Sequence, residues 1–265
     1  MYKKLKPLFG RMGSKYTMIE EIIPLIPQHT IYVEPFVGGG SIFWNKAPAE
    51  KSVINDLDKE LIDGYRGFKQ ASLSSLQALD YLDTKISRKD YKTDLYRSMV
   101  DKLESDMDAI QSQPVKHFIQ MFKRSRGRFW CKSSKGRIYF NLSFSPYISN
   151  LEQYKKQIKD TTIENKNYAD IINKYDSPTT FFFLDPPYEA SKGMYKNEMI
   201  DYEQMRDILR NIKGKFLLTL NDSERIRDIF KEFHIEKSKT KAGISRGGKL
   251  WEGGRNEIYI SSGKI

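Results

Sequence analysis

The hydrophobic and polar positions of the chain follow two different periods. Short apolar runs bounded by polar or turn residues recur near both ends of the chain, and this pattern predicts buried strands. We predict such strands at 31–34, 52–56, 179–184, 216–220, 235–240 and 257–261. Apolar residues at helical spacing predict helices at 41–46, after residue 56 through Leu61 and Tyr65, at 202–212 and at 224–233.

The order strand, turn, helix, strand predicts parallel βαβ units, and hence an α/β fold with a doubly wound, Rossmann-like sheet. Residues 66–165 differ, because their apolar positions recur at helical spacing among many charges and because 115–150 are basic and aromatic. We therefore expect one α/β domain made of 1–65 and 166–265. Residues 66–165 are expected to be an inserted, mainly helical domain that carries a basic hairpin.

Charge and composition narrow the classes of partner. The 265 residues carry a formal net charge of +11, which favours a polyanion such as nucleic acid. No apolar stretch is long enough for a transmembrane helix, and the first residues lack a hydrophobic signal core, so we expect an intracellular protein without a membrane partner. The single cysteine, Cys131, and three scattered histidines give no metal-ligand spacing, so no metal requirement is expected.

A glycine-rich turn follows the first predicted strand. Its residues run Glu34-Pro35-Phe36-Val37-Gly38-Gly39-Gly40, and glycines there let the backbone approach a ligand closely. Asp56 ends the second strand, where an acid can accept hydrogen bonds from ribose hydroxyls. The glycine spacing differs from that of dinucleotide sites, and no P-loop lysine follows. The pattern favours a nucleoside ligand without a pyrophosphate, although a structural tight turn is the alternative.

The second motif, Asp185-Pro186-Pro187-Tyr188, stands at the end of a buried strand, where α/β sheets place ligands. The Asp185 carboxylate and the Pro186 carbonyl can each accept one hydrogen of an adenine amino group, which turns the nitrogen lone pair toward a methyl donor. Tyr188 can stack on the base. Transfer would be a direct in-line displacement that depends on positioning and electrostatics.

At these residues the chain resembles the Dam-type (alpha-group) DNA adenine-N6 methyltransferases. The resemblance spans nearly the whole chain and is specific at 9–15, 33–41, 55–56 and 185–188. It implies a Rossmann-like methyltransferase sheet and S-adenosylmethionine as the donor, with Lys15 near the donor carboxylate and Asp56 on its ribose. Arg11 stands where the family commonly has Trp or Tyr. The donor-binding residues expected are Arg11, Lys15, Glu34, Pro35, Phe36, Gly38, Gly40, Asp56 and Asp185.

The segment 115–150 contains eight Lys or Arg residues and no Asp or Glu. Phosphate contacts would give affinity and salt dependence, and a duplex adenine must be flipped out to reach Asp185. The segment resembles the Dam recognition hairpin at Arg126-Gly127-Arg128-Phe129, but the Asn-Val-Pro that follows in the family is absent, so GATC recognition is not implied. The DNA-binding residues expected are Lys123, Arg124, Arg126, Arg128, Phe129, Trp130 and Arg137.

Three alternatives stay open at this point. Methylation of RNA adenine or of a protein glutamine amide poses the same lone-pair problem, although Asp185 in place of Asn favours adenine. A DNA-binding protein that keeps the fold without activity is a further interpretation, and the basic segment could be no more than a solvated hairpin. The sequence decides neither the recognition site nor an accompanying restriction enzyme. It also leaves open a monomer or a weak dimer on double-stranded DNA.

Overall fold

Seven short strands form one mixed sheet in the computed structural model. The structure describes residues 4–11, 13–77, 85–86, 116–118, 120–122, 125, 140–141, 145–188, 200–239, 245–246, 249–250 and 256–263. In chain order the strands of this sheet are β1 Ile31–Glu34, β2 Lys51–Asn55, β5 Thr162–Glu164, β6 Thr180–Leu184, β7 Lys215–Asn221, β8 His234–Lys237 and β11 Glu257–Ser261. They are arranged in the order β5-β2-β1-β6-β7-β11-β8.

The strands from β5 to β7 pair in parallel, whereas β11 runs antiparallel to both of its neighbours, β7 and β8. All five residues of β6 are buried, as expected for a central strand covered on both faces. The predicted doubly wound α/β sheet is thus confirmed. The antiparallel β11 brings Glu257, at its start, beside Asn221, at the end of β7.

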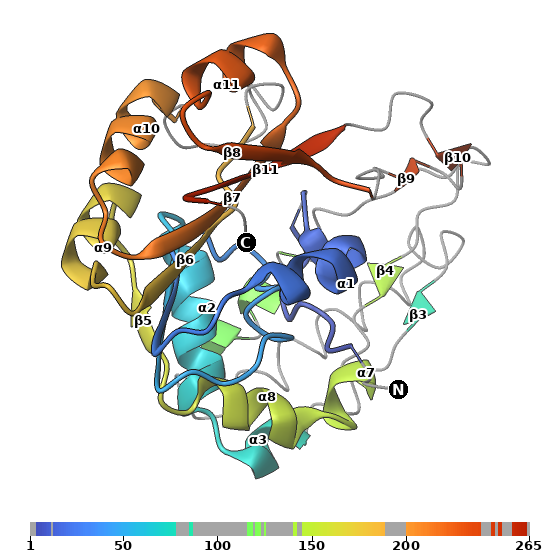
Figure 1. Ribbon diagram of the computed structural model, residues 1–265. Helices are drawn as coiled ribbons and strands as arrows, with labels where there is room; N and C mark the ends of the chain where they lie inside the picture. The colour runs from blue at the N-terminus through green and yellow to red at the C-terminus, as the bar shows by residue number, and fades with distance from the viewer. Residues whose placement is uncertain are drawn as a thin grey trace.

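Helices cover both faces of this sheet. The helical elements are η1 Lys15–Met18, α1 Ile19–Ile22, η2 Ile23–Leu25, α2 Lys59–Gln70, α3 Leu73–Gln77, α7 Ser145–Ile148, α8 Leu151–Ile158, α9 Tyr168–Tyr175, α10 Tyr202–Arg210 and α11 Glu224–Ile229. Figure 1 shows α9, α10 and α11 along one side of the sheet, with α2 and α8 on the other. Two short pairs, β3 Lys85–Ile86 with β4 Phe140–Asn141 and β9 Ser245–Arg246 with β10 Lys249–Leu250, lie outside it.

Strand alternation divides the core into two clusters. Phe181, Phe183 and Leu217 belong to the cluster that also contains the N-terminal residues Phe9 and Met18. The intervening residues Phe182, Leu184 and Leu218 belong to the cluster formed with α9, α10 and α11. Because successive strand residues point to opposite faces, Asp185 continues on the face that the N-terminal segment covers.

Two parts of the chain differ from the sequence-based expectation. Residues 41–46 form turns instead of the expected helix. Trp44 and Lys46 donate to the fourth residue back, but Asn45 donates to the third, so consecutive helical hydrogen bonds do not form. Pro48 prevents the helix from continuing. Residues 162–164, expected in the insertion, form β5 at the edge of the main sheet. The preceding α8 packs into the core through Leu151, Tyr154 and Ile158. The expected insertion otherwise falls mostly outside the described residues.

Candidate active site

The glycine-rich loop after β1 packs closely against the protein at Gly39 and Gly40 and is open at Gly38. Gly38 and Gly40 have positive φ values of +48° and +73°. A Cβ on Gly39 would lie 2.5 Å from the Phe9 carbonyl oxygen, and one on Gly40 would lie 2.8 Å from the Tyr65 hydroxyl. A Cβ on Gly38, by contrast, would meet no heavy atom of the described residues within 4 Å. Gly38 is therefore the loop position that a ligand can approach.

Asp56 holds this loop from the end of β2. Its Oδ2 accepts the Gly38 N–H at 3.0 Å, and its Oδ1 accepts the Asp58 N–H at 2.9 Å. Burial raises the pKa of Asp56, while these backbone hydrogen bonds and the nearby Arg11 lower it. The side chain is only partly buried, so the carboxylate can still accept a hydroxyl beside Gly38.

Arg11 and Phe36 flank the loop. The Arg11 guanidinium pairs with the Asp58 carboxylate, which also caps α2 by accepting the N–H groups of Glu60 and Leu61. The half-buried Phe36 ring lies 5.3 Å from that of Tyr168 on α9. Arg11, which stands where the family commonly has an aromatic residue, is thus tied to the start of α2.

Glu34 lies behind the loop and is 2% exposed. Its Oε2 accepts the Tyr32 hydroxyl at 2.8 Å, and burial raises the pKa of Glu34 to about 8. The nearby Lys46 ammonium lies 4.3 Å from the centre of the Tyr32 ring, and its own pKa is lowered by burial to about 8. Burial therefore favours the protonated form of Glu34, whereas Tyr32 and Lys46 favour the ionised form. Pro35 and Gly40 are also buried.

The Asp185 carboxylate stands at the end of β6, with a 20% exposed side chain. The contacts that the described residues make with it all go to Oδ1: Lys15 Nζ lies at 2.7 Å, Thr219 Oγ1 at 2.8 Å and the Tyr188 hydroxyl at 3.4 Å. Tyr202 fixes the rest of the motif by donating to the Pro187 carbonyl at 2.8 Å. These contacts leave Oδ2 without a partner among the described residues.

Tyr188 is buried against the same carboxylate. Its pKa is raised well above the usual range, mainly by burial and then by the charge of Asp185. The phenol therefore stays protonated and can donate to Asp185. The Lys15 ammonium lies 4.9 Å from the centre of the Tyr188 ring.

Lys15 has other partners than those implied by the family resemblance. Its side chain is 3% exposed, and its ammonium donates to the Gly13 carbonyl at 3.0 Å besides pairing with Asp185. Because a buried ammonium requires compensating charge, these partners account for its position. The structure thus brings Lys15 to the acceptor motif, whereas the resemblance places it at the donor carboxylate.

Glu257 completes this cluster, and sequence reasoning missed it. Its Oε1 lies 3.7 Å from Lys15 Nζ, and its side chain is 3% exposed. Burial raises the pKa of Glu257 to about 7, while the charge of Lys15 lowers it. An acid at the first position of an otherwise apolar strand was the available signal, but its neighbours could not be read from the chain.

The residues expected to bind DNA lie outside the described residues: Lys123, Arg124, Arg126, Arg128, Phe129, Trp130 and Arg137. The start of the basic segment is described and is anchored in the core. The Phe118 ring lies 5.8 Å from Phe9, and that of Phe122 lies 5.7 Å from Tyr147. The segment therefore begins close to the N-terminal residues that lead to Lys15.

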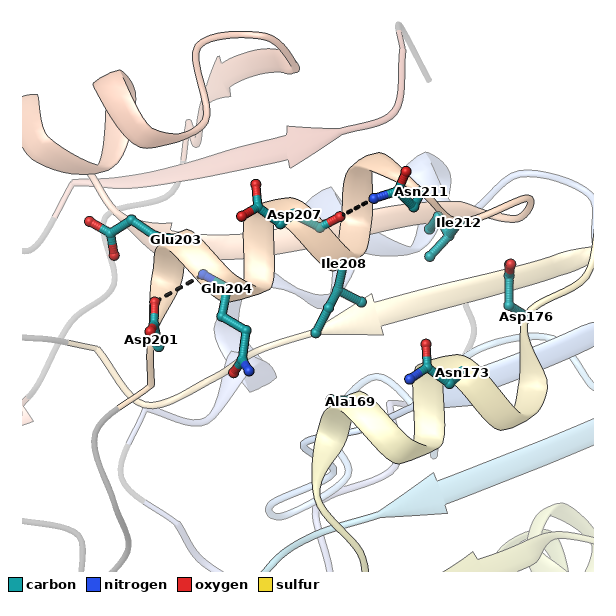
Figure 2. A pocket seen from close by; sticks show the side chains of 10 residues that line it. All are labelled: Ala169, Asn173, Asp176, Asp201, Glu203, Gln204, Asp207, Ile208, Asn211 and Ile212. Carbon is teal, nitrogen blue, oxygen red and sulfur yellow. Dashed lines mark hydrogen bonds between the residues drawn. The ribbon is translucent and has the colours of Figure 1, made fainter.

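A groove between α9 and α10 differs from this site. Figure 2 shows that acids line it, among them Asp176, Asp201, Glu203 and Asp207. Asp176 accepts the N–H groups of Lys213 and Gly214, and Asp201 caps α10 by accepting that of Gln204. Asp176 and Asp201 therefore have structural roles. The acids make the groove unsuitable for DNA phosphates, and none of the residues predicted to hold the donor lines it.

The open loop fits the expected S-adenosylmethionine. Gly38 presents backbone to open space, the partly exposed Asp56 beside it can accept ribose hydroxyls, and Phe36 offers a half-exposed ring. Within the described part of the chain, no group of three or more His, Cys, Asp or Glu residues could hold a metal ion. The helices of the same part are all too short or too polar to cross a membrane.

Comparison with known proteins identifies the family of this chain and several relatives. The family model for D12 class N6 adenine-specific DNA methyltransferases matches residues 12–244. The type II methyltransferase M1.LlaDCHI of Lactococcus lactis subsp. cremoris is 27% identical, over 97% of this chain and 95% of that protein. The DNA adenine methylase of Vibrio cholerae is 22% identical, over 97% of this chain and 94% of that protein.

Similarity to solved structures is weaker. A SAM-dependent O-methyltransferase from Thermotoga maritima shares 9% identity at a TM-score of 0.39, over 99% of this chain and 68% of that one. The family match, in contrast, spans most of the chain and includes the glycine-rich loop, Asp56 and the motif 185–188. The chain therefore belongs to the D12 class of N6 adenine-specific DNA methyltransferases, enzymes that transfer a methyl group from S-adenosylmethionine to the N6 amino group of adenine in DNA.

Proposed function

We propose that this enzyme methylates adenine at a specific sequence in double-stranded DNA, by direct transfer to a base flipped out of the helix. Asp185 is the central catalytic residue. The observation that carries the proposal is the one-sided binding of its carboxylate, in which Lys15, Thr219 and Tyr188 all contact Oδ1. Oδ2 then serves as the acceptor for one amino hydrogen, and the Pro186 carbonyl accepts the other.

The chemistry follows from the weak nucleophilicity of the adenine amino group, whose lone pair is delocalised into the ring. Hydrogen bonds to Asp185 and Pro186 favour a tetrahedral nitrogen, whose lone pair is then free to attack. S-adenosylmethionine, when bound, supplies an electrophilic methyl group. The nitrogen forms its bond to the methyl carbon as the sulfur–carbon bond breaks, and the amino proton leaves toward Asp185. Fixed acceptors lower the barrier because they need no reorganisation.

Donor binding falls to the residues around the open side of the loop. Gly38 gives close backbone approach, Asp56 accepts the ribose hydroxyls, and Phe36 packs against the nucleoside. Glu34, Pro35 and Gly40 are buried and support the loop from behind. Arg11 positions Asp58 and, through it, the start of α2.

Target recognition falls to the basic segment 115–150. Its lysines and arginines would contact phosphates and base edges, and Arg126, Phe129 and Trp130 are candidates to fill the gap left by the flipped adenine. Its anchored start at Phe118 and Phe122 would keep the segment close to the catalytic strand end. A DNA substrate also places the working enzyme wherever the target genome is replicated.

The test compares Asp185→Ala with Asp207→Ala, which removes an acid that is 54% exposed on α10. Donor binding is measured by calorimetry, and transfer of a tritiated methyl group is measured on duplex DNA of mixed sequence and on RNA. We expect Asp207→Ala to bind donor and transfer the methyl group as the wild type does. Asp185→Ala should lose transfer by at least about 100-fold even at donor concentrations that saturate it. Full transfer by Asp185→Ala would refute the mechanism, and transfer to RNA alone would refute the choice of substrate.

A further inference from the structure

Glu257 lies on the same face of the sheet as the catalytic carboxylate. It pairs in register with Asn221 of β7, as Tyr259 pairs with Thr219. Thr219 in turn donates to Asp185 Oδ1 at 2.8 Å. Because residues two apart on a strand share a face, Glu257, Thr219 and Asp185 all point toward the N-terminal segment that carries Lys15.

One ammonium serves two carboxylates in this cluster. Lys15 Nζ lies 2.7 Å from Asp185 Oδ1 and 3.7 Å from Glu257 Oε1. Lys15 and Glu257 are each 3% exposed, so water screens their interaction little. Glu257 Oε2 is buried and has no hydrogen-bond partner among the described residues. The carboxylate thus contributes charge to the cluster without being neutralised by a full set of hydrogen bonds.

We propose that Glu257 is a positioning residue for methyl transfer, which shares the Lys15 ammonium with Asp185 and so keeps Asp185 a strong acceptor for the adenine amino group. The inference rests on the role proposed above for Asp185. Glu257 lies beyond residues 12–244, which the family model matches. In this role it acts through the Lys15 ammonium, and it also lies beside Asp185 and Tyr188.

The ionisation of Glu257 decides how much of the negative charge of Asp185 the Lys15 ammonium neutralises. When Glu257 is ionised, Lys15 is divided between two acids, and Asp185 retains more negative charge. When Glu257 is protonated, the ammonium belongs to Asp185 alone, and the carboxylate becomes a weaker acceptor. The titratable groups that face Glu257 are Lys15, Asp185 and Tyr188, and burial among them raises the pKa of Glu257 to about 7.

The test is the pH dependence of Glu257→Gln. Single-turnover rates are measured at saturating donor and duplex DNA from pH 6 to about 9. We expect the wild-type rate to rise through pH 7, and the variant to stay near the low-pH rate throughout. At high pH the variant should be roughly tenfold slower, the effect of weakening one charge-assisted hydrogen bond. Its affinity for S-adenosylmethionine, measured by calorimetry, should be unchanged.

Two further variants serve as controls. Glu257→Asp keeps an acid and should restore a rise of the rate with pH. Glu236→Gln removes the same charge from β8, where the side chain is exposed, and should keep the wild-type profile. If Glu257→Gln retains the pH step and is merely slower at every pH, Glu257 is only structural and the inference is overturned.

The role of Glu257 can fail independently of the role of Asp185. Loss of transfer in Asp185→Ala together with an unchanged pH step in Glu257→Gln would refute the role of Glu257 alone. Should Glu257→Gln fail to fold, Lys15→Gln provides the second measurement, because it removes the shared ammonium. The pH step must then disappear as well, and its persistence would overturn the inference.

Discussion

The Lys15 ammonium lies 2.7 Å from Asp185 Oδ1 and is almost fully buried. This contact joins the N-terminal segment to the end of β6 and uses the carboxylate oxygen that also accepts Thr219. The ion pair thereby fixes the rotation of the carboxylate. Lys15 therefore has two possible roles: it can support the motif 185–188, or it can bind the carboxylate of the donor.

Lys15→Met distinguishes these roles. Because Lys15 fixes the rotation of the Asp185 carboxylate that presents Oδ2 to the amino group, we expect the rate of transfer at saturating donor to fall at least tenfold. The dissociation constant of S-adenosylmethionine should change less than threefold, as measured by calorimetry. A large loss of donor affinity with an unchanged saturated rate would instead support the role that the family resemblance implies. Lys59→Met, an exposed lysine on α2, is the control.

The glycines of the donor loop should respond differently to alanine. Gly40→Ala combines a positive φ with a Cβ only 2.8 Å from the Tyr65 hydroxyl, so we expect it to lower the free energy of unfolding by about 2–4 kcal/mol. Gly38→Ala adds a Cβ in open space and should lower it by only about 1 kcal/mol. Urea unfolding measures both changes.

Gly38→Ala should nevertheless weaken binding of S-adenosylmethionine, since its Cβ would point to the side where we place the donor. Calorimetry on the folded variant measures this effect. Unchanged donor affinity would show that the donor does not approach Gly38.

Stability should fall as pH rises from about 5 to 8 because of Glu34. Its pKa of about 8 in the folded protein lies above its ordinary value of 4.5, so the folded state holds a proton that the unfolded state releases in this window. One such group lowers the free energy of unfolding by at most about 1.4 kcal/mol per pH unit. Glu257, whose pKa is raised to about 7, makes the free energy of unfolding fall more steeply as pH rises toward 7.

Glu34→Gln removes this titration and can keep an acceptor for the Tyr32 hydroxyl. The melting temperature of the variant should therefore decline less between pH 5 and 8 than that of the wild type, as followed by calorimetry. Lys46 affects the profile only above pH 8. There its lowered pKa makes the free energy of unfolding rise with pH, which is opposite to the effect of Glu34. Parallel profiles for variant and wild type would show that Glu34 is ionised in the folded protein.

The basic segment should determine the salt dependence of DNA binding. Replacing Arg126 and Arg128 by alanine should weaken binding and reduce the slope of log K against log salt by about one for each phosphate that the protein no longer neutralises. Lys231→Ala removes an exposed lysine in the turn after α11 and should leave the slope unchanged. Titration of duplex DNA at several salt concentrations measures both. An unchanged slope in the arginine variant would exclude these residues from the phosphate contacts.

Local pattern determined much of the fold. Short apolar runs identified β1, β6 and β11, and helical spacing identified α2 and α10, because burial selects residues by their period along the chain. The motif 185–188 and the loop 34–40 likewise predicted the chemistry, since their residue types limit what a strand end can do. The helix predicted at 41–46 was wrong, because six residues allow too few helical hydrogen bonds to offset the cost of starting a helix, and Pro48 prevents its extension.

The tertiary structure decided which charges meet. Lys15 precedes Asp185 by 170 residues and Glu257 by 242, and no periodic pattern links positions so far apart. Their contacts depend on the strand order, which sets β11 beside β7 and the N-terminal segment over both. The sequence by itself predicted transfer of a methyl group to an amino nitrogen, with adenine favoured by Asp185. Folding alone placed a buried lysine between two acids, because only packing removes the water that would otherwise separate them.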